Sequence, residues 1–314
     1  SHLHAFSCYR KMNRREFLQT SIAIGALPVL AARKERRHPA ITLGFSLYGM
    51  KTLKTEDALR QLAKIGYDSV ELCLNDDWDA APKNVTAKRR KELRILLGDL
   101  GLKLTALMIN IKLNGMQKVS ISKIREAGQM GHDLSPNDPP IIESVGGSGK
   151  WKDVKNEFRD NLDHWATAAK ASKSVVCLKP HRFGAVNRPE DAVGLIKQVK
   201  SQWLKLAYDY SHFIHRDIGF EDSLKTMIPH TRFIHVKDTI IKNGKPRFVL
   251  PGESSLIDYH KLIWRAHELG YRGDINVEVS GQVWNQPGYD PIAAALKSYR
   301  NIAPAIKKKK GSSN

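Results

Sequence analysis

Four short stretches in the second half of the chain carry most of the side chains suited to chemistry. Each follows a short apolar run, and the next one begins about 25 to 45 residues later, which is close to the length of a strand plus a helix. Polar groups at the ends of successive parallel strands meet at one mouth, where barrel enzymes carry their chemistry. The stretches are Cys177–His181, Tyr208–His212, Phe233–Asp238 and Asn276–Ser280.

Three of these strand ends offer the ligands that a divalent metal prefers. Asp209, His235 and Glu278 supply two carboxylates and an imidazole, a set suited to Mn, Mg, Zn or Co. His212 follows Asp209 by three residues, so it can leave the strand and face the same mouth. Asp238 stands in the same relation to His235, and we expect it to fix the tautomer of that histidine from behind.

The elements that must position these residues alternate from Ile41 onward. Eight strands alternating with helices imply a parallel sheet closed on itself, the (β/α)8 TIM barrel. An open doubly wound sheet lacks support, because no Gly-x-Gly-x-x-Gly follows the first strand. The predicted strands are 41–47, 69–74, 103–109, 140–145, 174–178, 204–208, 231–236 and 274–279. The predicted helices are 55–66, 86–101, 154–172, 188–200, 220–228, 258–270 and 290–306, with a weaker helical pattern around 121–127.

The N-terminal residues carry the pattern of an export signal. Arg14 and Arg15 precede Phe17 and then a stretch of apolar and small residues, 21–32. A paired arginine before such a stretch is typical of the twin-arginine route, and about 12 residues are too few to span a bilayer. We expect residues 1–38 to be an N-terminal extension with this signal, 39–306 the barrel and 307–314 a disordered basic tail. The protein would then be periplasmic or otherwise exported, with no transmembrane span in its mature form.

The formal charge of +19 allows nucleic acid as a partner on charge alone. However, residues 1–40 hold eight Lys and Arg against two acids, and 307–310 are four lysines, so much of the excess lies at the ends. The remaining charge is ordinary for a solvated basic surface. We therefore expect no nucleic-acid partner, and these numbers leave a homo-oligomer open. The resemblance described next implies a small-molecule carbohydrate as substrate.

Several runs across roughly 41–303 resemble the xylose-isomerase-like TIM barrels. That superfamily holds sugar isomerases, sugar 3-epimerases, inosose dehydratases and endonuclease-IV-type DNA repair enzymes, so the resemblance is specific for the superfamily and weak for the substrate. The runs are Ala58–Leu72, Asp209-x-x-His212, His235-x-x-Asp238, Leu250–Glu253 and Gly270–Glu278.

In the epimerase branch, the resemblance implies one divalent ion held by four strand-end residues, of which two glutamates also move the proton. Asp209, His235 and Glu278 match three of them, and His212 matches a substrate-binding histidine. Where the family usually has the fourth ligand, a glutamate ending strand five, this chain has Lys179. An ammonium cannot ligate a metal and repels one beside it. Either Lys179 replaces the cation, or a metal binds with fewer ligands or with help from Glu143 or His181.

The mechanism that these residues favour is proton abstraction next to a carbonyl, with Glu278 as the general base. A metal or Lys179 would stabilise the enediolate oxygen, and a desolvated Lys179 could also act as base or Schiff-base nucleophile. We assign substrate binding to His181, Arg182, His212 and Glu143. Three aromatic side chains near loop starts could stack on a sugar ring, although packing is the commoner role of each. They are Tyr48, Trp78 and Trp284.

The predicted function is therefore an exported isomerase or epimerase of a sugar or sugar derivative. Alternatives are a lyase or dehydratase acting on a keto-sugar or inosose, and a non-catalytic sugar-binding barrel with a degenerate strand-five position. DNA repair is disfavoured, because it needs further metal-binding histidines on early strands, where this chain has Glu71 and Asn110.

Overall fold

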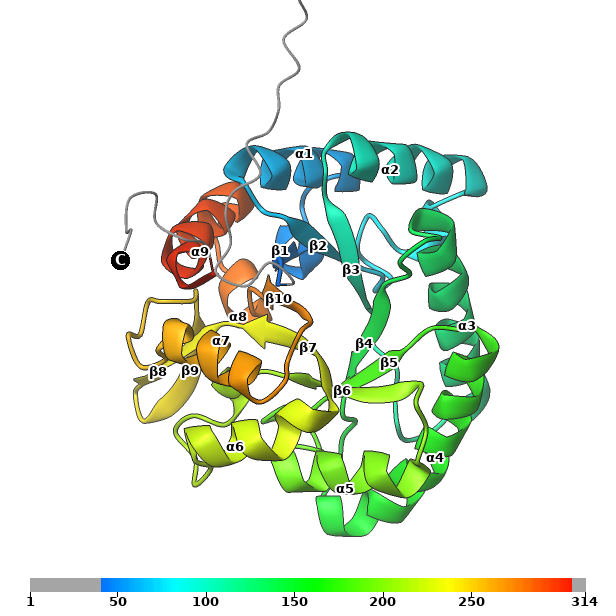
Figure 1. Cartoon of the computed structure of the whole chain (residues 1–314), viewed down its shortest axis with the longest axis vertical. Coiled ribbons are helices and arrows are strands. Elements are labelled where there is room, and N and C mark those ends of the chain that lie inside the picture. Colours follow the sequence, from blue (N-terminus) through cyan, green and yellow to red (C-terminus); the bar gives the residue numbers. More distant parts are fainter. Residues whose placement is uncertain (1–40, 307–314) are drawn as a thin grey trace, which may run out of the picture. The chain divides into compact units, whose positions relative to one another are not determined.

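The computed structural model describes residues 41–306, which form a closed ring of strands surrounded by helices (Figure 1). Eight parallel strands close in the order β1-β10-β7-β6-β5-β4-β3-β2. This order confirms the predicted (β/α)8 TIM barrel. The barrel strands are β1 (Leu43–Ser46), β2 (Ser69–Cys73), β3 (Lys103–Met108), β4 (Ile141–Val145), β5 (Val176–Lys179), β6 (Leu204–Tyr208), β7 (Thr231–Val236) and β10 (Asp274–Val277).

Except for one four-residue helix that has no buried residue, the helices pack around the outside of the barrel and bury apolar residues against it (Figure 1). They are α1 (Thr55–Ile65), α2 (Ala87–Asp99), α3 (Gln117–Leu134), α4 (Trp151–Ala171), α5 (Pro189–Val199), α6 (Phe220–Met227), α7 (Tyr259–Glu268), α8 (Gly281–Trp284) and α9 (Pro291–Ile306). Four short 3-10 helices lie in the connections between strands and helices. They are η1 (Leu47–Met50), η2 (Pro82–Asn84), η3 (Tyr210–His212) and η4 (Ile228–His230). Within residues 41–306, no helix has the length and apolar character needed to cross a bilayer. The export signal and the basic tail predicted at the two ends lie outside the described residues.

Helix α1 shows why sequence signals located most of these elements. Its first turn carries Glu56 and Asp57, which suit the positive end of the helix dipole. It ends at Gly66, whose φ of 110° is open to glycine and strained for other residues. The apolar residues between these ends face the barrel, so the amphipathic pattern and the observed packing agree.

Helix α3 is longer than the weak pattern around 121–127 indicated. Met116 at its start makes no side-chain capping bond, and two interior glycines weaken the local helical signal. The glycine at 128 has a packing role, because a Cβ added there would lie 2.7 Å from the Cβ of Ser172. Tertiary packing therefore extends this helix beyond what its local sequence predicts.

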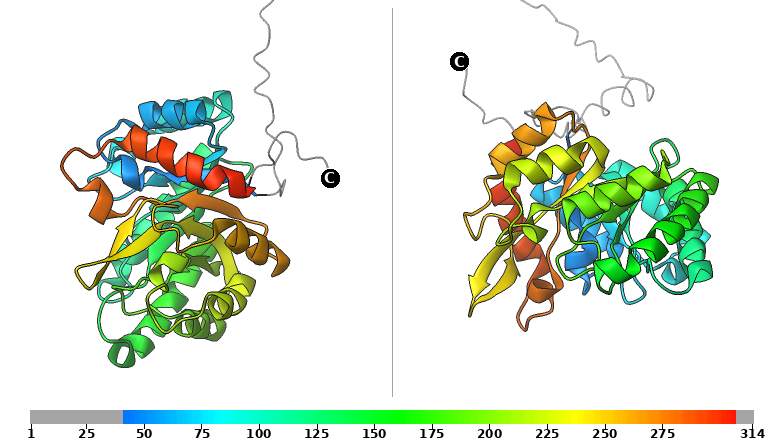
Figure 2. Two further views of the ribbon diagram at one scale, coloured as in Figure 1. Left: turned by 90° about the vertical axis from the view of Figure 1, so that its left-hand side faces the viewer. Right: turned by 90° about the horizontal axis from the view of Figure 1, so that it is seen from below.

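An antiparallel hairpin that periodicity did not predict follows β7. It consists of β8 (Asp238–Lys242) and β9 (Lys245–Val249), joined by Asn243 and Gly244, both with positive φ. A two-residue Asn-Gly turn of this kind matches the twist of paired strands. The Phe248 amide donates to Gln282 Oε1 at 2.9 Å, and the hairpin projects beside the α8 segment in both views of Figure 2.

Five side chains from adjacent strands form a small apolar layer inside the barrel. Strand side chains alternate between the two faces of a sheet, so this layer marks which residues point inward. On each of these strands, the residue two positions further along also points into the barrel interior. It lies nearer the carboxyl end of the strand. The layer consists of Ala106, Ile141, Cys177, Ala207 and Phe233.

Candidate active site at the mouth of the barrel

A layer of charged side chains lies directly above the apolar layer. Two residues beyond four of its members come Glu143, Lys179, Asp209 and His235, and Glu278 directly follows β10. The first four are each 1% exposed and Glu278 is 5% exposed. Ion pairs and hydrogen bonds join these side chains directly or through Lys237, so the convergence predicted for Lys179, Asp209, His235 and Glu278 is present in the structure. His212 and Glu143 also belong to this cluster.

Lys179 points into the cluster and contacts three of its members. Its Nζ donates to Glu278 Oε2, lies 2.9 Å from His235 Nδ1, and pairs with Glu143 Oε1 at 3.3 Å. Burial disfavours the charged form of Lys179, but Glu143 and Glu278 outweigh it and raise the lysine pKa above its usual range. Lys179 is therefore an ammonium, which stabilises an oxyanion, rather than the neutral amine that a Schiff-base nucleophile requires. Burial raises the pKa of Glu143, which Lys179 opposes, whereas the low pKa of Glu278 makes that carboxylate the main counter-charge of Lys179.

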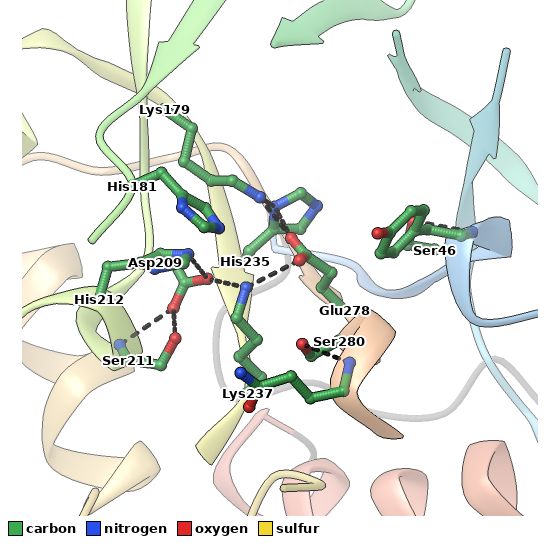
Figure 3. Close-up of polar contacts among 12 residues, drawn as sticks. Ser46, Lys179, His181, Asp209, Ser211, His212, His235, Lys237, Glu278 and Ser280 are labelled. Carbon is green, nitrogen blue, oxygen red and sulfur yellow. Dashed lines mark hydrogen bonds and ion pairs between the residues drawn. The ribbon is translucent and has the colours of Figure 1, made fainter. Parts of the chain in front are cut away.

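Lys237 is a second cation in the cluster, and sequence reasoning assigned it no role. Its Nζ donates to Glu278 Oε1 at 2.7 Å and pairs with Asp209 Oδ2 at 2.9 Å. Figure 3 shows Lys179 and Lys237 reaching the Glu278 carboxylate from different directions. A signal for Lys237 was present in the sequence, because it lies two residues after His235 and so shares its inward-facing side.

His235 lies between two carboxylates. Its Nε2 is 2.9 Å from Glu71 Oε2, and its Nδ1 is 2.9 Å from Glu278 Oε2. Burial lowers the pKa of His235, but Glu71 and Glu278 more than reverse this, despite the opposing charge of Lys179, and raise the pKa to about 9. His235 is therefore an imidazolium near neutral pH, in which Nε2 donates to Glu71 and Nδ1 donates to Glu278. The 2.9 Å between Lys179 Nζ and Nδ1 is then a close approach of two cations that share Glu278 Oε2, not a hydrogen bond.

The prediction that Asp238 orients His235 is wrong. Asp238 Oδ2 accepts hydrogen bonds from the amides of Gly252 and Ser254, so it holds the loop after the hairpin. The orienting carboxylate is Glu71 on β2. The i, i+3 spacing misled because Asp238 begins β8, where the chain has already turned away from the barrel interior.

Raising the pH through the His235 pKa is expected to destabilise the fold. The folded-state pKa of about 9 lies above the reference value of 6.5. The stabilising contribution is therefore complete below about pH 6.5 and is lost as the pH rises through 9, on the order of 3 kcal/mol. Melting temperatures measured from about pH 6 to about pH 10 should fall more steeply for the wild type than for His235→Gln. Parallel curves for the two proteins would contradict this assignment.

The two carboxylates at the centre of the cluster remain ionised. Burial raises the pKa of Glu278, but Lys179 and Lys237 outweigh it and hold that pKa well below its usual range. The pKa of Asp209 is likewise low, because Lys237 and His212 oppose the effect of burial. The cluster is therefore a buried network of opposite charges, in which removing one member leaves the others without compensation.

Two neutral histidines line one side of the cluster. Burial and nearby cations lower the pKa of His212 to about 4, and burial with His212 lowers that of His181 far below its usual range. Their ring centroids are 4.1 Å apart. The His212 Nε2 lies 3.4 Å from Asp209 Oδ2, while Arg182 donates through its amide to His212 Nδ1 and through its guanidinium to the Ile214 carbonyl.

A phenylalanine of the hairpin covers this side of the cluster. The Phe248 ring centroid is 4.9 Å from Lys237 Nζ and 5.2 Å from the His212 ring, and the Arg182 guanidinium lies 5.7 Å from it. The unpredicted hairpin therefore supplies a wall of the site.

Three aromatic residues were proposed to stack on a sugar. In this structure they pack against one another. Tyr48 stacks on Trp78 with ring centroids 5.2 Å apart, and Trp284 meets both rings edge-on. Lys51 Nζ lies 4.5 Å from the Trp78 centroid. Burial and the Glu278 carboxylate raise the pKa of Tyr48 to about 12, so its phenol stays protonated near the cluster.

As they stand here, the charged side chains do not fit a divalent metal ion. The ammonium of Lys237 contacts both Asp209 and Glu278, and the ammonium of Lys179 contacts the other oxygen of Glu278. An ammonium has no lone pair, and an imidazolium has none free either. Among residues 41–306, no group of three or more His, Cys, Asp or Glu side chains is arranged to hold a metal ion.

Several solved structures share this fold. The IOLI protein with a bound zinc atom is 18% identical, with a TM-score of 0.68 over 84% of this chain and 98% of that one. D-psicose 3-epimerase from Clostridium cellulolyticum H10, solved with D-tagatose, is 14% identical, with a TM-score of 0.65 over 83% and 99%. The probable 3-DHS dehydratase AsbF from Bacillus anthracis is 13% identical, with a TM-score of 0.68 over 84% and 99%.

The structures above share only the fold with this chain, whereas comparison of sequences identifies its family. No curated protein gives a significant match to this chain. A sequence model described as the xylose isomerase-like TIM barrel matches residues 59–302, which cover most of the chain and every barrel strand except β1. This chain therefore belongs to the xylose isomerase-like TIM barrel family.

Proposed function

We propose that this protein is an isomerase or epimerase of a sugar or sugar derivative, which removes a proton from a carbon next to a carbonyl and passes through an enediolate. The observation that carries the proposal is the pair of buried ammonium groups, Lys179 and Lys237, hydrogen-bonded to the Glu278 carboxylate at the barrel mouth. Family membership and the fold shared with D-psicose 3-epimerase support the same class of chemistry.

Glu278 is the general base in this proposal. It is ionised, it is more exposed than Glu143, Lys179, Asp209 and His235, and it sits where a strand ends. A positioned carboxylate that transfers a proton in the transition state contributes roughly 10²- to 10⁴-fold to the rate. The proton removed from carbon would reside on a Glu278 oxygen, and its return to the neighbouring carbon gives isomerisation. Epimerisation needs a second acid that protonates the opposite face of the same carbon, and the ammonium of Lys179 is the candidate for it.

The two lysines stabilise the oxyanion that forms when the proton leaves. Before substrate enters, Lys179 and Lys237 donate to Glu278 and keep it a weak base. A substrate oxygen that accepts hydrogen bonds from these ammonium groups draws them away from Glu278, and the proton affinity of the carboxylate then rises. The charge of the enediolate develops beside cations that are already positioned, which is the condition for electrostatic catalysis.

The neutral histidines orient the substrate. His181 accepts from the Phe183 amide through Nδ1, so its proton is on Nε2. His212 accepts from the Arg182 amide and directs Nε2 toward Asp209. Uncharged imidazoles that donate one hydrogen bond suit sugar hydroxyls, and they do so without adding charge to the cluster.

Dehydration is the second candidate, and His181 is the observation that favours it. The same enolate loses water if an acid protonates a hydroxyl on the next carbon. No hydrogen bond to His181 Nε2 occurs within residues 41–306, so its N–H can hold the leaving hydroxyl by a hydrogen bond. The proton for that hydroxyl would come from the Glu278 carboxyl, which took it from carbon, because a neutral imidazole is too weak an acid. The shared fold with the dehydratase AsbF is consistent with this branch.

We further propose that the protein is exported by the twin-arginine route. The support is the sequence alone: Arg14 and Arg15 before a moderate apolar stretch. Fractionation of cells that make the full chain, compared with cells that make Arg14→Lys/Arg15→Lys, tests this. Equal amounts outside the cytoplasm for both proteins would rule out the route.

Proton NMR in D2O tests the catalytic proposal directly. The purified protein is incubated with a panel of ketohexoses, ketopentoses and an inosose. Isomerase or epimerase chemistry exchanges a carbon-bound proton next to the carbonyl for deuterium and forms a stereoisomer or positional isomer. Dehydration instead yields an unsaturated or deoxy product with loss of water. Binding by calorimetry without exchange would contradict both and leave a sugar-binding barrel.

A further inference from the structure

A groove of about 840 Å³ lies on the outer side of the Phe248 wall, between the hairpin and the α8 segment. The hairpin follows β7 and α8 follows β10, so the groove opens at the carboxyl ends of the strands, the same end as the charged cluster. Phe248 belongs to both: it lines the groove, and its ring lies 4.9 Å from Lys237 Nζ. Only the Phe248 side chain thus separates a ligand in the groove from the proposed catalytic residues.

Three cations of the hairpin line this groove without a counter-charge. Lys242 lies directly opposite Lys245 in the β8–β9 register, and Arg247 is two positions beyond Lys245 on the same face. Like charges directly opposite across a strand pair are destabilising. The groove lining contains no acidic residue, and within residues 41–306 none of the three cations forms an ion pair. An anionic ligand would relieve this repulsion.

The groove also continues toward the aromatic cluster. Asn285 and Gln286 line both this groove and a neighbouring hollow of about 430 Å³. That second hollow is also lined by Lys51 and Trp284. Side-chain amides can both donate to and accept from hydroxyls, and an aromatic face provides a flat apolar surface. The surface beyond the three cations therefore has the groups that bind further sugar rings.

We propose that this groove binds a negatively charged sugar chain, whose end enters the cluster past Phe248. The inference rests on the proposed function, because it assigns the reacting end of the ligand to the site of Glu278 and the two lysines. The anionic group is a carboxylate or a sulfate ester on the sugar, since either would neutralise Lys242, Lys245 and Arg247. Nucleic acid would pair with the same three cations, but the amides of Asn285 and Gln286 and the face of Trp284 beyond them match the hydroxyls and faces of sugar rings, and the DNA duplex below tests this choice.

Calorimetry with the full chain tests the groove independently of turnover. The probes are a tetrasaccharide of galacturonate, a sulfated galactose tetrasaccharide, an unsubstituted galactose tetrasaccharide and a short DNA duplex. We expect one of the anionic sugar chains to bind at least ~10-fold more tightly than the neutral one, with affinity falling as salt is raised. The anionic chain that binds identifies the charged group as carboxylate or sulfate.

The variant Lys242→Gln/Lys245→Gln/Arg247→Gln should lose that preference. Its matched control is Lys64→Gln/Lys170→Gln/Lys197→Gln, which removes three charges from the last turns of α1, α4 and α5, at the opposite end of the barrel. The control should bind like the wild type. Equal affinity for anionic and neutral chains, tighter binding of DNA, or an equal loss in both triple variants would overturn the proposal.

Glu278→Gln separates this inference from the proposed function. Groove binding should persist in that variant while deuterium exchange is lost. Charge-dependent binding in a wild type that exchanges no proton in any sugar would refute the proposed function and leave the anion-binding groove. If the wild type exchanges the proton but binds charged and neutral chains equally, the groove proposal is refuted and the proposed function is kept.

Discussion

Replacing Glu278 with glutamine is expected to lower the rate of deuterium exchange into a substrate sugar by at least ~10³-fold. The amide cannot accept the carbon-bound proton at neutral pH, and the substrate would have no other carboxylate so near both lysines. Exchange followed by NMR in D2O measures the effect. A variant that retains exchange close to the wild-type rate would remove Glu278 as the base.

The same variant is expected to be less stable, and this needs a control. Glu278 neutralises Lys179, Lys237 and His235, and breaking a buried charge network by removing one partner typically destabilises by about 3–5 kcal/mol. Glu278→Asp keeps the charge but withdraws the carboxylate by one methylene. It should melt closer to the wild type than Glu278→Gln does, yet lose about 10²-fold in exchange, because a displacement of about 1 Å is enough for such a loss.

Combining Lys179→Glu with Lys237→Met is expected to create a divalent metal site. The first change restores the carboxylate that the resemblance implies at the end of strand five. The second removes the ammonium that now contacts both Asp209 and Glu278. We expect affinity for Zn²⁺ or Mn²⁺ to rise at least ~100-fold over the wild type in calorimetry, together with a metal-dependent increase in melting temperature.

The single variant Lys179→Glu is the informative control. It leaves Lys237 in place and adds a carboxylate beside Glu143 and Glu278, so it should bind metal far more weakly than the double variant. If the single variant bound the metal as tightly as the double variant does, the Lys237 ammonium would not be what keeps a metal ion from Asp209 and Glu278. No gain in the double variant would show that Asp209, His235 and Glu278 do not converge as ligands.

Local sequence signals were sufficient for most of the fold. Strand runs such as 231–236, and helices with clear start and stop residues such as α1, fell close to their predicted positions because both kinds of element follow short-range periodicity. The exceptions have physical reasons. Helix α3 contains glycines whose role depends on a neighbouring helix. The β8–β9 hairpin departs from the strict alternation of strand and helix on which the prediction relied.

The candidate site divides in the same way. The convergence of Lys179, Asp209, His235 and Glu278 followed from strand ends alone, since parallel strands in a barrel bring their carboxyl ends to one mouth. The partners within that mouth did not follow, because a contact such as His235 with Glu71 joins residues 164 positions apart. Asp238 has the spacing expected of a partner of His235, but its carboxylate binds the loop amides of Gly252 and Ser254 instead. Spacing along the sequence therefore did not identify the partner of His235, because it does not say which way a side chain points.

The sequence by itself determined the barrel, the family and the strand ends that form the candidate site, because periodicity and strand-end composition are local properties. Only the tertiary structure decided the electrostatic character of that place. Whether a carboxylate binds a metal or an ammonium depends on distances of about 3 Å between side chains from different strands. Lys237 reaches both Asp209 and Glu278 at such distances, and the hairpin that follows it supplies Phe248 and the three cations of the groove.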